Sequence, residues 1–203
     1  QQNGKYGFTM PASAVTVKAT FMDDNTMLNF FVDVSASDYY YDAVLWAVGK
    51  GITGGTSATT FDPRGNCTRA QAVTFLWRAA GSPAPKTKVM PFTDVPAGSY
   101  YHDAVLWAME QGITKGTSDT AFSPNATCTR AQIVTFLYRA MGESSEGRIP
   151  FTDVPGGSYY EEAVSWATAS GVTNGMAAGI FAPDEDCTRA QIVTFLFRAY
   201  NNK

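Results

Sequence analysis

The apolar positions of this chain recur three times in the period of an α-helix, and each time they form two separate stripes. The first stripe reads Ala-Val-x-Trp-Ala and lies at residues 43–47, 104–108 and 163–167. The second reads Ala-x-x-Val-x-x-Leu and lies at residues 70–76, 131–137 and 190–196. Stripes of this spacing are typical of amphipathic helices that bury one face. The pattern therefore predicts a mainly α fold built from three helix–loop–helix repeats.

The pentapeptide Cys-Thr-Arg-Ala-Gln opens the second stripe of every repeat, at residues 67–71, 128–132 and 187–191. Its Thr can cap the helix and its Gln can bond back to the cap, which together make a capping box. The Arg stands at the first helical position, where the helix dipole disfavours a cation. We therefore expect Arg69, Arg130 and Arg189 to be exposed and to form anion sites together with free N–H groups of the helix start.

Two glycines and a Phe-x-Pro phrase define the connection between the two helices. The first glycine, at Gly51, Gly112 and Gly171, is expected to end the first helix in the left-handed conformation. A second glycine follows at Gly55, Gly116 and Gly175, and Phe-x-Pro follows at residues 61–63, 122–124 and 181–183. The first helix itself is expected to begin near Asp38, Ser99 and Ser158, since Asp and Ser cap helices well.

Residues 1–28 differ from the repeats, because positions 14–21 alternate in the period of a half-buried strand and are rich in β-branched side chains. The phrase FTMPASAVTVKATF resembles the last strand of small β-repeat modules in bacterial surface proteins. We expect residues 1–28 to be such a strand plus a linker, and the whole sequence to be part of a longer chain. The three repeats are then expected at residues 29–85, 86–147 and 148–203.

Composition and charge exclude several classes of function. The chain has 203 residues and a net charge of −3, which disfavours nucleic acid as a partner. No apolar run approaches the roughly 18 residues that a membrane helix needs. No Ser or Cys nucleophile is paired with a His, and no motif places two carboxylates together, so we expect neither an enzyme nor a cofactor. Metal binding is not expected either, because the three cysteines lack paired spacing and are better explained as small buried residues.

Taken together, the motifs resemble the S-layer homology family over about 170 of the 203 residues. Each copy contains Phe-x-Asp-Val, a Trp-Ala helix, Gly-Ile/Val-Thr-x-Gly, Phe-x-Pro and Thr-Arg-Ala-Gln. The resemblance implies a pseudo-threefold bundle with three prongs. It also implies an extracellular module, associated with the cell wall or S-layer, that binds secondary cell-wall polysaccharide without a covalent bond, often a polysaccharide bearing an acidic pyruvyl ketal.

The resemblance further implies a carbohydrate site in grooves between neighbouring repeats. By position, its residues are the three arginines together with Asp33, Asp94 and Asp153; Trp46, Trp107 and Trp166; and Gly55, Gly116 and Gly175. Two departures from the family pattern affect this site. The usual Glu of Thr-Arg-Ala-Glu is Gln71, Gln132 and Gln191, which makes the site more electropositive, and Met176 replaces the Thr of the other two loops. We expect the groove that uses the Met176 loop to be weakened or silent. If this loop completes the groove of Arg189, the Arg189→Ala variant should show the smallest loss of binding.

A second class of function stays open at this stage. The repeats could serve as a structural or interaction protein that contacts other surface-layer chains or a host receptor. The wall-binding hypothesis also predicts how variants of the three arginines behave. If the arginines are exposed ligand contacts, their removal should weaken ligand binding without lowering the melting temperature.

Overall fold

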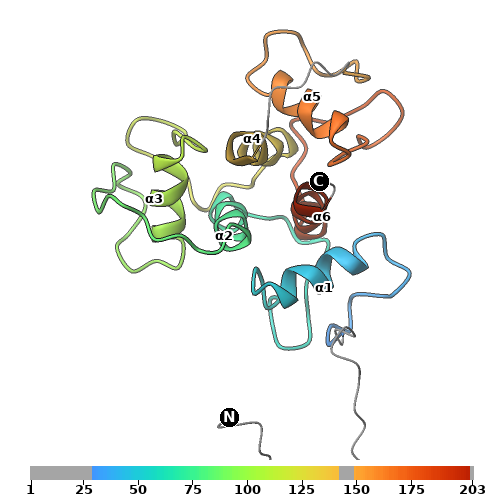
Figure 1. Cartoon of the computed structure of the whole chain (residues 1–203), viewed down its shortest axis with the longest axis horizontal. Coiled ribbons are helices and arrows are strands. Elements are labelled where there is room, and N and C mark those ends of the chain that lie inside the picture. The colour runs from blue at the N-terminus through green and yellow to red at the C-terminus, as the bar shows by residue number, and fades with distance from the viewer. Residues whose placement is uncertain (1–28, 142–148, 202–203) are drawn as a thin grey trace, which may run out of the picture.

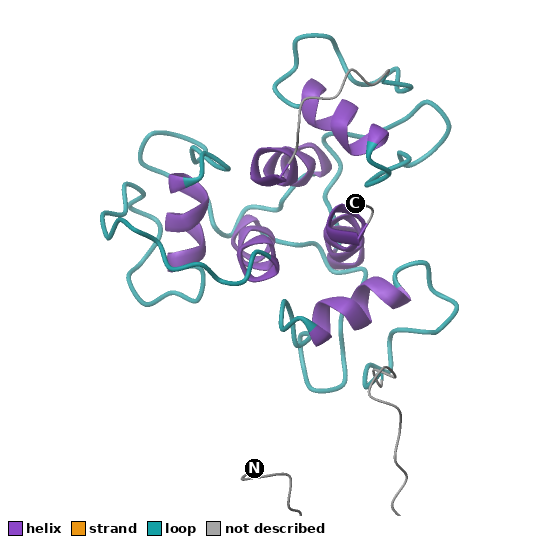
Figure 2. Ribbon diagram, in the orientation of Figure 1, coloured by secondary structure: helices purple, strands orange, loops and turns teal. Residues whose placement is uncertain are grey.

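The computed structural model describes residues 29–141 and 149–201, which form six helices, two in each repeat (Figures 1 and 2). The helices are α1 (Tyr41–Gly49), α2 (Arg69–Ala79), α3 (His102–Glu110), α4 (Arg130–Met141), α5 (Glu161–Ala169) and α6 (Arg189–Asn201). Between the described residues, β-pairing is limited to isolated bridges. The mainly α, three-repeat prediction is confirmed. The predicted N-terminal strand and the boundary at residues 147 and 148 lie outside the described residues.

The six helices form a three-pronged assembly around a central triangle. Figure 1 shows α2, α4 and α6 at the centre, each seen nearly end-on, with one outer helix beside each. The outer helix of each prong comes from the following repeat: α3 packs on α2, α5 packs on α4, and α1 closes the circle by packing on α6. Every outer stripe is therefore covered by a different repeat, so the three repeats depend on one another for their cores.

A ring of three backbone hydrogen bonds joins the repeats just before the central helices begin. The N–H of Cys67 donates to the carbonyl of Cys187 at 3.0 Å, that of Cys128 to Cys67 at 2.8 Å, and that of Cys187 to Cys128 at 2.9 Å. All three thiols are buried and none forms a disulfide. Burial raises the pKa of the Cys67 thiol to about 12, which leaves it unreactive at neutral pH.

The central helices begin as the capping boxes predict, but their first N–H groups are occupied. In α2, Thr68 accepts from the Gln71 N–H at 3.2 Å, and the Gln71 side chain accepts from the Thr68 N–H at 3.0 Å. The N–H groups of Arg69 and Ala70 donate to carbonyls of the next repeat, at Ala126 and Pro124. The same bonds recur in α4 and α6. The expectation that these N–H groups are free to bind an anion is therefore wrong, because they join one repeat to the next.

The outer helices begin two to three residues later than predicted. The N-cap residues of α1, α3 and α5 are Tyr40, Tyr101 and Tyr160, and none of them forms a side-chain cap. Asp38 instead accepts from the Ser35 N–H at 2.7 Å, within the turn that precedes α1. The cap prediction failed because a residue that favours caps also favours the preceding turn.

The two predicted glycines take left-handed conformations in every repeat. Gly51 has φ +68° and ends the first helix, as expected. Gly55 has φ +86°, and a Cβ placed there would lie 2.5 Å from both the Phe31 ring and the Thr60 carbonyl oxygen. The second glycine is therefore required by both backbone conformation and space.

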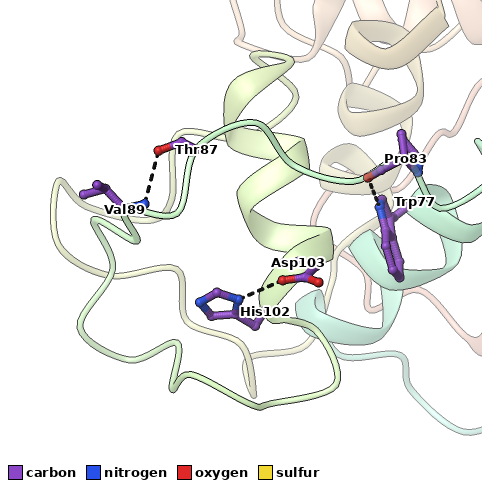
Figure 3. A network of polar contacts seen from close by, with 6 residues as sticks. All are labelled: Trp77, Pro83, Thr87, Val89, His102 and Asp103. Carbon is purple, nitrogen blue, oxygen red and sulfur yellow. Dashed lines mark hydrogen bonds and ion pairs between the residues drawn. The ribbon is translucent and has the colours of Figure 1, made fainter.

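The linker between the first two repeats is hydrogen-bonded to the helices on both sides of it, and Figure 3 shows the bond to Trp77 of α2. The Trp77 indole of α2 donates to the Pro83 carbonyl at 2.9 Å. Further along, the Glu110 carboxylate at the end of α3 accepts from the N–H groups of Lys86 and Thr87. His102, the single histidine, lies at the start of α3 with Nδ1 3.0 Å from the Asp103 carboxylate.

Candidate functional site

The arginine of each Thr-Arg-Ala-Gln motif is buried and reaches into the next repeat. Arg69 is 4% exposed, and its Nε donates to the Phe122 carbonyl at 3.0 Å. Its guanidinium carbon lies 4.9 Å from the centre of the Phe122 ring and 5.5 Å from that of Phe136. Arg130 and Arg189 repeat this arrangement with Phe181 and Phe195, and with Phe61 and Phe75. The prediction of exposed arginines is therefore wrong, because the loop of the next repeat covers them.

Two of these buried guanidinium groups keep an unused donor. The Nη1 of Arg69 donates to Gln132 at 3.1 Å, but the buried Nη2 atoms of Arg69 and Arg130 have no hydrogen-bond partner among the described residues. Arg189 differs, since its Nη2 lies 3.4 Å from the Thr53 hydroxyl. Burial lowers the pKa of all three guanidinium groups, but arginine stays charged because its pKa starts so high. Within the described residues, no carboxylate forms an ion pair with them.

Arg69 lies in a cavity of about 360 Å³, here called groove A, to which all three repeats contribute. Arg69 comes from the first repeat, and the third repeat adds Tyr159. The second repeat supplies the glycine loop 114–117 and one face of α4. None of the described residues that line the cavity carries a carboxylate. Groove A therefore combines cations, hydroxyls, an amide and an exposed ring.

Arg130 lies in the equivalent cavity of about 420 Å³, here called groove B. The glycine loop 173–176 and α6 belong to the third repeat, and Tyr39 comes from the first. Met176 is part of this loop, and its sulfur accepts from the Gln191 side-chain amide at 3.4 Å. The Met176 loop thus completes the groove of Arg130 and not that of Arg189. The reason is that each arginine meets the glycine loop of the following repeat.

The third equivalent location, here called position C, is formed around Arg189. It contains Phe61, Phe75 and Thr53 of the first repeat. Tyr100 of the second repeat is close enough to act electrostatically on Arg189. The threefold arrangement is therefore complete in outline, although the arginine at position C already has a hydroxyl partner.

The aspartates expected in the site hold its framework. Asp33 Oδ1 accepts from the Phe61 N–H at 2.9 Å, and Oδ2 accepts from the Asp62 N–H at 2.7 Å. The Phe61 carbonyl in turn accepts from Arg189. Asp94 and Asp153 make the same pairs of bonds. Burial alone would raise the pKa of Asp153, but the N–H groups of Phe181 and Ala182 lower it.

The tryptophans expected in the site lie between helices, away from the residues that line grooves A and B. Trp46 of α1 packs against Phe197 of α6, with ring centres 5.7 Å apart. Trp166 of α5 packs against Tyr138 of α4 at 6.0 Å. Trp107 is buried in the core. These rings therefore join outer to central helices.

The loop glycines lie where the sequence placed them. Gly116 lines groove A and Gly175 lines groove B. The Gly116 N–H donates to the Thr114 hydroxyl at 3.2 Å, and Gly55 and Gly175 make the same bond to Thr53 and Thr173. These bonds, with the left-handed backbone, fix the loop that faces each arginine.

The tyrosines at the grooves were missed by the sequence interpretation. Tyr39, Tyr100 and Tyr159 are between 58% and 65% exposed, and each ring meets the next tyrosine edge-on at 5.0 Å. The sequence does carry a signal, a Tyr-Tyr pair at the same place in all three repeats. The sequence did not show that these tyrosines lie near the arginines, because each tyrosine meets an arginine from another repeat.

Two further findings concern alternative chemistry within residues 29–141 and 149–201. None of the helices there is long and apolar enough to cross a membrane. The same residues contain no group of three or more His, Cys, Asp or Glu side chains that could hold a metal ion.

Comparison with known sequences points to one family. The sequence profile of the S-layer homology domain matches three segments, residues 30–73, 91–134 and 150–193. Each match runs from the Phe-x-Asp phrase, through the outer helix and the glycine loop, into the central helix. The matched segments make up more than half of the chain.

Curated relatives carry similar segments within longer chains. The surface-layer 125 kDa protein of Lysinibacillus sphaericus is 30% identical over 213 positions, which cover 100% of this chain and 17% of that protein. An endoglucanase of Bacillus sp. strain KSM-635 is 36% identical over 60% of this chain and 13% of its own length. A cellulosome-anchoring protein of Acetivibrio thermocellus is 26% identical over 74% and 34%. This chain thus spans 13% to 34% of these relatives.

Proposed function

Because this chain belongs to the S-layer homology domain family, we propose that it anchors an exported protein to the bacterial cell wall by binding wall polysaccharide in grooves A and B. Residues 29–203 act as one unit in this proposal, since each prong is shared between two repeats. The names of the relatives, a surface-layer protein and a cellulosome-anchoring protein, support an anchoring role.

One observation carries the choice of ligand: within residues 29–141 and 149–201, the buried Nη2 atoms of Arg69 and Arg130 have neither a hydrogen-bond partner nor an ion pair. A buried cation is costly unless an anion or acceptor satisfies it. A saccharide carboxylate, such as that of a pyruvyl ketal, supplies both a charge and oxygens for a charge-assisted hydrogen bond. We therefore propose that the polysaccharide is acidic and that its carboxylate contacts the arginine.

The remaining groups suit the rest of a sugar ligand. Thr117 and Gln132 in groove A offer a hydroxyl and an amide that can bond sugar hydroxyls. Tyr159 presents an exposed ring that can cover the apolar face of a sugar. We assign Asp94 and Trp107, with their counterparts, a supporting role, since they hold the loops and helices that form the groove.

The proposal is tested by retention on purified cell-wall sacculi, before and after the secondary polysaccharide is removed. We expect wild type to bind intact sacculi and to lose binding to stripped ones. The double variant Tyr39→Ala/Tyr159→Ala should bind poorly, because it alters both grooves at exposed positions, while the matched Tyr39→Phe/Tyr159→Phe variant should bind nearly as well as wild type. Equal retention on stripped sacculi would contradict the proposal and favour the interaction-protein alternative.

A catalytic role is not proposed for this chain. The endoglucanase relative matches it over only 13% of that enzyme's length, within a much longer chain. The match is best explained by an anchoring segment that can accompany different proteins. The name of this relative is therefore consistent with a wall-binding unit attached to an enzyme.

A further inference from the structure

The three glycine loops differ at the residue just before the second glycine. This residue is Lys115 in groove A, Asn174 in groove B and Gly54 at position C. Lys115 and Asn174 are exposed, and each lines its groove. The three locations therefore have the same backbone arrangement but differ in the residue at this one position.

Charge is consequently unequal among the three locations. Among the described residues, groove A is lined by Arg69, Arg139 and Lys115 and by no carboxylate. In the same part of the chain, groove B is lined by Arg130 and Arg198 without a third cation, and its Gln191 amide is already bonded to Met176. Position C has no loop side chain at Gly54, and its arginine already meets Thr53.

We propose that Lys115 makes groove A the dominant site for an acidic saccharide and that affinity falls from groove A to groove B to position C. This inference rests on the proposed function. The unused Nη2 of Arg69 supplies the buried contact, and the exposed ammonium of Lys115 supplies a second positive charge at the groove. An anion that reaches both is held by a guanidinium and an ammonium together.

The loss experiment uses Lys115→Gln, which keeps a long polar side chain and removes the charge. The probe is a methyl hexoside bearing a pyruvyl ketal, titrated against the full chain by NMR, with the carboxylate ester of the same hexoside as the neutral control. Tyr159, Tyr39 and Tyr100 serve as separate reporters for groove A, groove B and position C. We expect the substitution to weaken groove A about twofold to fivefold at low salt and to leave groove B unchanged.

The gain experiment uses Gly54→Lys. Gly54 does not have a left-handed backbone, and an added Cβ would meet no atom within 4 Å, so the loop accepts a side chain there. We expect this variant to bind the acidic hexoside more tightly at position C than wild type does, whereas the matched Gly54→Gln variant should not. The gain should shrink as salt is raised, since exposed charges are screened.

Two results separate the inference from the function on which it rests. If the acidic hexoside binds wild type in none of the three locations, both are overturned. If it binds but Lys115→Gln leaves groove A unchanged, or if groove A is not the tightest location in wild type, the role of Lys115 is overturned and the proposed function stands.

Discussion

Groove A has two walls of opposite character, one formed by Arg69 and the other by Tyr159. Arg69 is 4% exposed and is bonded to a carbonyl and an amide of the next repeat, whereas Tyr159 is 62% exposed. The proposed ligand site is therefore built partly from the interface that holds the repeats together. We therefore expect a mutation at the arginine wall to change folding and binding together, and a mutation at the tyrosine wall to change binding alone.

The largest expected effect comes from the arginine wall. Arg69→Ala should lower the free energy of unfolding by about 3 kcal/mol, because it removes a charge-assisted bond to the Phe122 carbonyl and contacts with two rings. Our expectation from sequence, that the melting temperature would not fall, is replaced by this one. Denaturant unfolding followed by circular dichroism measures the change.

Arg69→Lys is the matched control for that substitution. Lysine keeps the positive charge but lacks the planar fork that bonds the carbonyl and lies between the rings. Most of the stability should therefore be lost in this variant as well. If either variant unfolds at the same denaturant concentration as wild type, Arg69 does not join the repeats and the contrast between the two walls fails.

Substitutions in the glycine loop between the two walls should lower the free energy of unfolding by an intermediate amount. The loss should depend more on the space available for a Cβ atom than on the backbone φ angle. A Cβ at Gly116 would lie 2.5 Å from the Ala121 carbonyl oxygen and the Phe92 ring, with φ at +80°. Gly112 has a similar φ of +69° but open space around it. Gly112→Ala should cost about 1–2 kcal/mol for the left-handed conformation alone.

Gly116→Ala should cost clearly more and should also weaken ligand binding in groove A, because the loop must move to relieve the contacts. Thermal unfolding of the two variants gives the comparison directly. Equal losses at the two glycines would mean that the loop adjusts freely, so that it does not hold the groove in shape.

The success of the sequence interpretation depended on how local each feature is. The starts of the central helices were predicted correctly, since Thr68 and Gln71 bond to each other within three residues. The left-handed conformation of Gly51, Gly112 and Gly171 was predicted for the same reason. The starts of the outer helices were not, because Asp38 found a local partner in a turn rather than a helix.

Features that depend on another repeat could not be predicted from local pattern. The helical position of Arg69 gave no sign that Phe122, far along the sequence, would cover it. From its helical spacing, Trp46 could have contacted either a ligand or another helix. In the structure it packs against Phe197, which lies near the other end of the chain. The groove tyrosines were missed because they complete sites whose arginines lie in different repeats.

The smallest expected effect on stability comes from the tyrosine wall. Tyr159→Ala should change the free energy of unfolding by no more than about 0.5 kcal/mol, because most of the ring is already in water. The same variant should weaken saccharide binding in groove A roughly threefold to tenfold, the effect of losing an aromatic contact. The neighbouring Tyr160→Ala is the matched control, since that ring is partly buried against the core and its loss should cost at least about 1 kcal/mol. If Tyr159→Ala destabilised the protein as much as Tyr160→Ala does, Tyr159 would also belong to the interface between repeats. Weaker binding by the Tyr159→Ala variant would then not be evidence for a ligand contact.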